Sequence, residues 1–64
     1  MFDNLKAELA RRGLDGKKLA NLTGIHINTM YKKLNGEHEF KLNEMELIKA
    51  ILRTDAPYEY LFKR

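Results

Sequence analysis

The segment from Leu19 to Gly36 constrains the fold more than any other part of this 64-residue chain. Ala20 is small enough for a second helix to cross close to it, and Gly24 can take a positive φ at almost no steric cost. Three apolar residues then return to a shared core, namely Ile25, Met30 and Leu34. The segment therefore predicts two short helices that are joined by a tight turn.

Caps and apolar spacing predict the helices of the first half. The first helix carries an apolar stripe of Phe2, Leu5 and Leu9, and it is expected to end near Gly13. Asp15 is a favourable N-cap for the second helix. The third helix is expected over residues 27–34, with Asn35 and Gly36 at its end.

The fourth helix is expected to begin with a capping box. Asn43 is the predicted N-cap, and Glu46 lies three residues later. Leu42, before the cap, is expected to pack on Leu47 as a hydrophobic staple. The apolar face then continues at helical spacing through Met45, Ile48, Ile51 and Leu52.

Two further segments complete the chain. Residues 37–42 are polar with Phe40 as their one large apolar residue, which predicts an ordered loop. Pro57 fits the first turn of a short fifth helix. No segment alternates apolar and polar residues for long enough to indicate a strand. We therefore expect a single all-α domain over residues 1–64, a compact bundle of about five short helices.

Composition narrows the class of protein. The chain is 44% hydrophobic, which is typical of a globular domain, and it has no cysteine, which excludes disulfides and thiolate metal sites. No apolar run is long enough for a membrane span, and the first residues do not resemble a signal peptide. These features predict a cytoplasmic protein with no metal, no cofactor, no small-molecule substrate and no membrane partner.

The positive charge lies in the half of the chain that holds the predicted turn. The net charge is +3, and seven basic residues stand against three acidic ones before position 37. After that position, five basic residues stand against six acidic ones. Such clustering attracts phosphate groups, although a solvated surface of an ordinary protein can carry the same excess.

The central segment resembles a known family. Its residues Leu19-Ala20, Thr23-Gly24-Ile25, Thr29-Met30-Tyr31 and Leu34-Asn35-Gly36 are similar to the helix-turn-helix of the Cro/repressor (XRE) superfamily. Residues 56–62 further resemble the tail of small Cro-like proteins of Gram-positive phages and prophages. The resemblance implies a lambda-repressor-like DNA-binding domain with its helix-turn-helix at the second and third helices.

The resemblance also implies a function and a set of DNA contacts. The protein is expected to be a sequence-specific transcription regulator, of phage or prophage Cro/repressor type, that reads double-stranded operator DNA through the major groove. The implied base readers are Ile27, Asn28 and Lys32, with Tyr31 and Asn35 beside them. Helical spacing independently places four of these five residues on one face, all except Ile27.

Their chemistry suits base edges. Asn28 can pair with the edge of adenine, Lys32 can donate to guanine, and Ile27 can touch a thymine methyl group. The resemblance places His26 at a helix cap near the DNA backbone. It also places Lys17 and Lys18 at the start of the second helix, whose N-terminal amides face phosphate.

Two residues depart from the family pattern. Gly16 stands where many relatives have a glutamine that touches phosphate and braces the recognition helix. Lys33 stands where the family is frequently apolar, so we expect its side chain to snorkel or to contact phosphate. Neither departure breaks the fold.

Several assignments leave alternatives open. Ile27 also fits the core stripe of Met30 and Leu34. Tyr31 either lies at the edge of the core or contacts a phosphate group. Lys17, Lys18 and Lys33 can be solubilising charges instead of contacts, and the two histidines show no metal-ligand spacing. Tyr58, Leu61 and Phe62 either pair two copies of the chain into a homodimer on DNA or close the core of one copy.

Three classes of function are compatible with a helix-turn-helix. DNA binding is favoured by the basic first half of the chain. A protein-interaction module, such as an antitoxin or an adaptor, would keep the scaffold without specific DNA binding. An enzyme is not expected, since no nucleophile pairs with a base and no glycine-rich phosphate loop is present.

Overall fold

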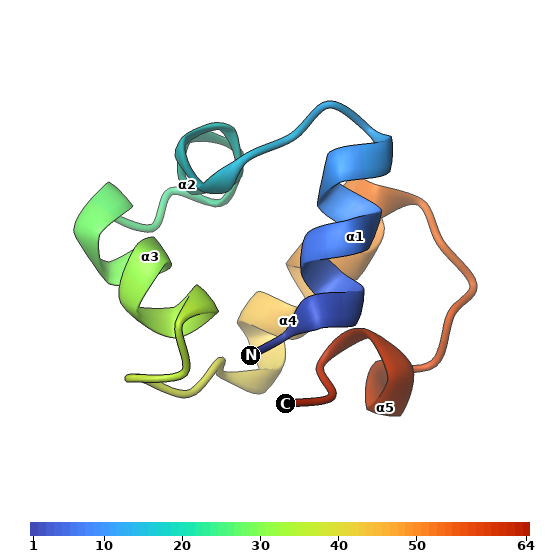
Figure 1. The fold of residues 1–64 in the computed structure, drawn as a ribbon. Coiled ribbons are helices and arrows are strands. Elements are labelled where there is room, and N and C mark those ends of the chain that lie inside the picture. Colours follow the sequence, from blue (N-terminus) through green and yellow to red (C-terminus); the bar gives the residue numbers. More distant parts are fainter.

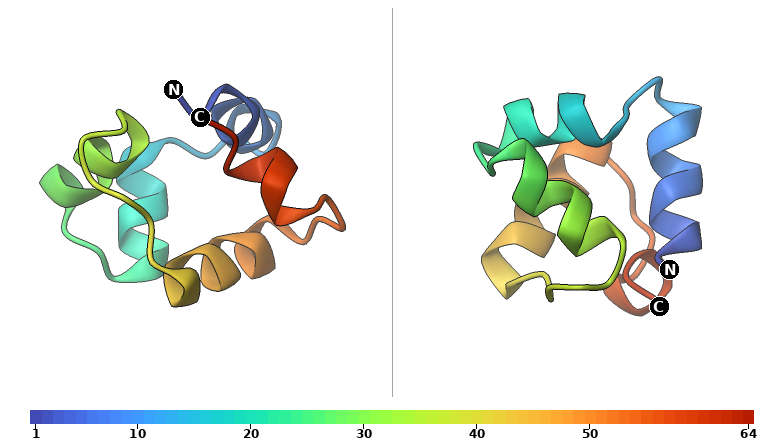
Figure 2. Two further views of the ribbon diagram at one scale, coloured as in Figure 1. Left: turned by 90° about the horizontal axis from the view of Figure 1, so that it is seen from below. Right: turned by 60° about the vertical axis from the view of Figure 1, so that its left-hand side comes forward.

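Five helices and no strand make up the structure, a computed structural model that describes residues 1–64 (Figure 1). The helices are α1 (Asp3–Arg11), α2 (Gly16–Thr23), α3 (Ile27–Leu34), α4 (Leu42–Leu52) and α5 (Tyr58–Leu61). The α2–α3 pair forms one side of the molecule, and α1 with α5 forms the other (Figures 1 and 2). None of the five has both the length and the apolar character that a membrane crossing requires. The predicted all-α fold is confirmed.

The first three helices begin and end where the sequence predicts. The carboxylate of Asp15 accepts a hydrogen bond from the backbone N–H of Lys18 at 2.8 Å, which caps α2. Gly24 ends α2 with φ 77°, a conformation that glycine adopts without the strain a Cβ would bring. The predicted third helix, residues 27–34, matches α3 at both ends.

The core is assembled from every helix. Its ten buried apolar residues are Phe2, Leu5, Leu9, Leu19, Ala20, Met30, Leu34, Ile48, Leu52 and Leu61. Phe40 anchors the loop between α3 and α4, as predicted. Its ring meets the rings of Phe2 and Phe62 edge to face, with centroids 5.3 and 5.4 Å away. These ring contacts hold the loop against the core, although the loop contains no helix or strand.

The start of α4 differs from the prediction. The helix begins at Leu42, and the backbone N–H of Lys41 donates to the carboxylate of Glu44 at 2.8 Å. Asn43 is therefore inside the first turn and not the N-cap. Leu42 and Leu47 remain 62% and 42% exposed, so the predicted hydrophobic staple is wrong.

The C-terminal segment also corrects the prediction. Leu61 is completely buried and belongs to the core of the single chain. Phe62 is half-buried, and its ring stacks on the ring of Tyr58 with 6.4 Å between the centroids. Pro57 lies one residue before α5 and not within its first turn. Leu61 thus closes the core of the single chain, whereas Tyr58 and Tyr60 remain exposed.

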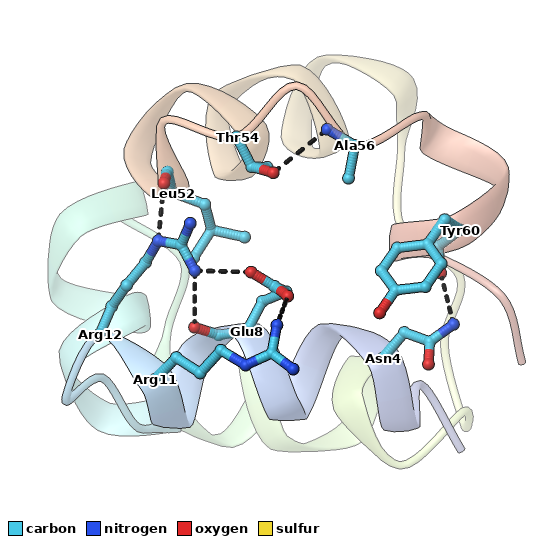
Figure 3. Close-up of polar contacts among 8 residues, drawn as sticks. All are labelled: Asn4, Glu8, Arg11, Arg12, Leu52, Thr54, Ala56 and Tyr60. Carbon is cyan, nitrogen blue, oxygen red and sulfur yellow. Dashed lines mark hydrogen bonds and ion pairs between the residues drawn. The ribbon is translucent and has the colours of Figure 1, made fainter.

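A polar cluster that the sequence analysis missed ties α1 to the second half of the chain (Figure 3). Glu8 is buried and pairs with the guanidinium groups of Arg11 and Arg12. Arg12 also donates from Nε to the backbone carbonyl of Leu52 at 2.7 Å, at the end of α4. A buried carboxylate is stable here because two cations and their hydrogen bonds compensate its lost hydration.

Candidate nucleic-acid interface

Helix α3 has one polar face and one core face. The polar face consists of exposed side chains at the predicted spacing, namely Asn28, Tyr31, Lys32 and Asn35. On the opposite face, Met30 and Leu34 are buried in the core, as the sequence predicts. The structure therefore gathers four of the predicted contact residues on one outward surface of the helix that follows the turn.

His26 caps the start of α3. Its Nδ1 atom accepts a hydrogen bond from the backbone N–H of Asn28 at 3.2 Å. A neutral imidazole that accepts at Nδ1 carries its proton at Nε2, so the exposed ring retains one donor. The predicted cap position is thus occupied by a side chain that can also donate to a phosphate oxygen.

Ile27 and Tyr31 each lie partly against the protein and partly in solvent. Ile27 is partly buried and packs against the core cluster. Tyr31 keeps 44% of its surface exposed, yet one edge of its ring lies against α2 at Gly16. A Cβ atom at Gly16 would come within 2.6 Å of Cε1 of Tyr31.

The start of α2 carries the two other predicted lysines. Both Lys17 and Lys18 are exposed. Lys18 donates from Nζ to the carbonyl of Gly13 at 3.1 Å, whereas the side chain of Lys17 has no hydrogen bond or ion pair. Lys17 is consequently the less restrained of the two charges at this helix terminus.

Lys33 does not belong to this surface, which corrects both predictions for it. Its Nζ atom donates to the carboxylate of Glu44 at 2.6 Å and to the carbonyl of Glu39 at 3.3 Å. Burial of Glu44 opposes its ionisation. The hydrogen bonds from Lys33 and Lys41 and their positive charges outweigh that effect and lower the pKa of Glu44. The pair joins α3 to the first turn of α4.

The residues after α3 are held by the C-terminal residue. Gly36 has φ 83°, and its carbonyl accepts a hydrogen bond from the guanidinium of Arg64 at 2.6 Å. The same guanidinium lies 5.5 Å from the ring centroid of Phe2 and 3.9 Å from the carboxylate of Glu39. These contacts fix the point at which the chain leaves α3.

Comparison with known families gives one match. The family described as the Cro/C1-type HTH DNA-binding domain matches residues 4–57, a range that includes α1 from its second residue, α2 to α4 and the Gly24 turn. No curated protein and no solved structure matches the chain. Since the family match covers most of the chain and α2 and α3 supply the expected geometry, the protein belongs to the Cro/C1-type helix-turn-helix family and is a DNA-binding regulator.

Proposed function

We propose that the protein is a sequence-specific transcription regulator of Cro/repressor type, of phage or prophage origin, that reads double-stranded operator DNA. The observation that carries this proposal is the exposed polar face of α3, which stands on a core of buried apolar residues. An α-helix fits the width of the major groove, and this face offers hydrogen-bonding side chains to base edges. The phage origin is supported by the resemblance of residues 56–62 to Cro-like tails.

The proposed contacts divide into base readers and backbone contacts. Asn28 pairs with adenine, Lys32 donates to guanine, and the exposed part of Ile27 touches a thymine methyl group. Backbone contacts are expected from residues near the helix starts and beside the reading face, and these are Lys17, Lys18, His26 and Asn35. Lys33 takes no part, because Glu44 already neutralises it.

Salt dependence tests DNA binding itself. In this scheme the two exposed lysines at the start of α2, Lys17 and Lys18, neutralise two phosphates, which predicts a slope of about −1.8 per protomer for log K against log salt. Fluorescence anisotropy with mixed-sequence DNA at several salt concentrations measures this slope. A slope near zero would contradict DNA binding and would favour a protein-interaction module such as an antitoxin or adaptor.

Selection from a random DNA library tests sequence specificity. Asn28→Ala and Lys32→Ala should each relax the preference at defined positions and cost about 1–3 kcal/mol of binding free energy. Lys17→Ala should weaken binding to all sequences about equally. Lys63→Ala removes an exposed lysine outside the helix-turn-helix and is the charge-matched control. Unchanged selectivity in Asn28→Ala would show that α3 does not read bases.

We further propose that two copies pair on the operator. One recognition helix reads too few base pairs for genomic discrimination, and paired copies commonly bind half-sites about 34 Å apart. Because Leu61 is buried, the aromatic surface available for pairing near the C-terminus is that of Tyr58 and Tyr60. Tyr60→Ala should keep the helical circular dichroism signal and reduce cooperativity on a palindromic site. Unchanged cooperativity would place the pairing surface elsewhere.

A further inference from the structure

Gly16 occupies a position where the backbone does not need glycine. It is the first residue of α2, and its φ lies outside the left-handed region that only glycine adopts easily. Alanine would therefore suit the backbone and would favour the helix. What excludes a larger residue is the ring of Tyr31, which lies 2.6, 2.9 and 3.1 Å from the place of a Cβ atom.

The contact lies far from the turn that joins the two helices. Gly24 connects α2 to α3 at one end. Gly16 is the opposite end of α2, two turns away, and Tyr31 is in the second half of α3. Ala20, buried between these points, lies on the same face of α2 as Gly16 because the two are four residues apart. The Gly16–Tyr31 contact is thus a second point, away from the turn, at which the two helices meet.

We propose that Tyr31 is a positioning residue whose ring, seated on Gly16, sets the angle of the recognition helix on α2. This inference rests on the proposed function, because the angle of α3 on α2 decides where Asn28 and Lys32 meet the base edges. The Tyr31 hydroxyl has no hydrogen-bond partner in the structure. The ring is therefore the part of the side chain that does the positioning.

A double-mutant cycle between the two positions tests the contact. We expect Gly16→Ala to lower affinity for the library-selected operator about tenfold, because the new methyl group displaces the ring and tilts α3. In a Tyr31→Ala background, Gly16→Ala should cause no further loss of affinity, since nothing remains for the methyl group to meet. Additive losses in the cycle would overturn the proposal.

A conservative variant separates positioning from a phosphate contact. Tyr31→Phe keeps the ring, so it should restore the affinity and the base preference that Tyr31→Ala changes. If Tyr31→Phe loses as much affinity as Tyr31→Ala, the hydroxyl and not the ring is responsible for the effect, and the proposal fails.

Thermal unfolding without DNA makes the test independent of the proposed function. Circular dichroism establishes that each variant is folded at the binding temperature. Gly16→Ala is expected to lower the Tm in the wild-type background and to raise it or leave it unchanged in the Tyr31→Ala background. A lowered Tm in both backgrounds would show that the Tyr31 ring is not what opposes a larger residue at position 16, and the proposal would fail. If the wild-type protein selects no DNA sequence, the proposed function fails while this cycle still decides whether the contact exists.

Discussion

Replacing Lys33 with methionine should destabilise the fold far more than the same change at its neighbour Lys32. The Lys33 side chain is only 7% exposed, and its partner Glu44 is 16% exposed. Lys33→Met keeps most of the apolar stem but leaves the carboxylate of Glu44 without its cation. The cost is therefore mainly that of an unpaired, largely buried charge.

The magnitude follows from what Glu44 retains. Removing one partner of a buried ion pair typically costs about 3–5 kcal/mol. Glu44 keeps the hydrogen bond from the N–H of Lys41 and a little contact with water, so we place the loss at about 2–3 kcal/mol. For a domain of this size, each kcal/mol lowers the Tm by about 4–8 °C, which predicts a fall of at least about 8 °C.

Thermal unfolding followed by circular dichroism at neutral pH measures this difference. Lys32→Met is the matched control, because Lys32 is exposed and pairs with no carboxylate, and its effect should stay within about 0.5 kcal/mol. Replacing both partners, as in Lys33→Met with Glu44→Leu, should recover most of the stability. Equal Tm values for the Lys33 and Lys32 variants would refute the reasoning.

The same pair predicts how stability depends on pH. The pKa of Glu44 in the folded protein lies below its ordinary value of 4.5. Its contribution is therefore fully present above that ordinary value and is lost as the pH falls through the folded-state pKa. Between about pH 5 and pH 3, Glu44→Gln should lose less stability than the wild type. Parallel stability curves would contradict this assignment.

Three further predictions concern the caps, the buried polar cluster and the core. Asp15→Ala should lower the free energy of unfolding by about 0.5–2 kcal/mol, whereas Asn43→Ala should stay within about 0.5 kcal/mol; equal Tm values would contradict the observed caps. Glu8→Ala should cost about 1–3 kcal/mol in urea unfolding, because it removes the charge-assisted hydrogen bonds that the Glu8 carboxylate accepts from Arg11 and Arg12, and an unchanged midpoint would argue against the cluster. Leu61→Ala should cost about 2–5 kcal/mol through the cavity it creates, while the exposed Leu42→Ala should be near neutral in the same assay.

Features that depend on neighbouring residues could be predicted from the sequence. Asp15 accepts from an N–H three residues away, and Gly24 supplies a backbone conformation that no neighbour has to impose. The polar face of α3 follows from helical periodicity alone. Such features depend only on nearby residues, so they can be predicted without knowing how the helices pack.

The wrong prediction for the start of α4 has a physical cause, because the sequence offers two possible capping boxes there. Asn43 with Glu46 and Lys41 with Glu44 both provide an acidic residue at the third position of a helix. The structure has the capping box of Lys41 and Glu44. The Glu44 carboxylate accepts a hydrogen bond from the N–H of Lys41 and a second one from Nζ of Lys33 in α3. Packing between helices thus selects a register that local propensity leaves undecided.

The remaining unpredicted features join residues that are distant in the sequence. Lys33 and Glu44 are 11 residues apart, and Arg12 reaches a carbonyl 40 residues away. The contact between Gly16 and Tyr31 likewise depends on how closely α2 and α3 approach. A charge in the sequence therefore indicates a DNA contact only after its partners inside the fold are known, as the burial of Lys33 demonstrates.

The placement of the chain ends around Gly36 has a consequence for protein engineering. The two termini lie side by side in all three ribbon views (Figures 1 and 2), and both Met1 and Arg64 reach Gly36. A short peptide could therefore join residue 64 to residue 1 and cyclise the backbone with little distortion of the helices. Cyclisation restricts the unfolded chain more than the folded one, so the ring should resist heat and exopeptidases better than the linear protein while it leaves the outer face of α3 free.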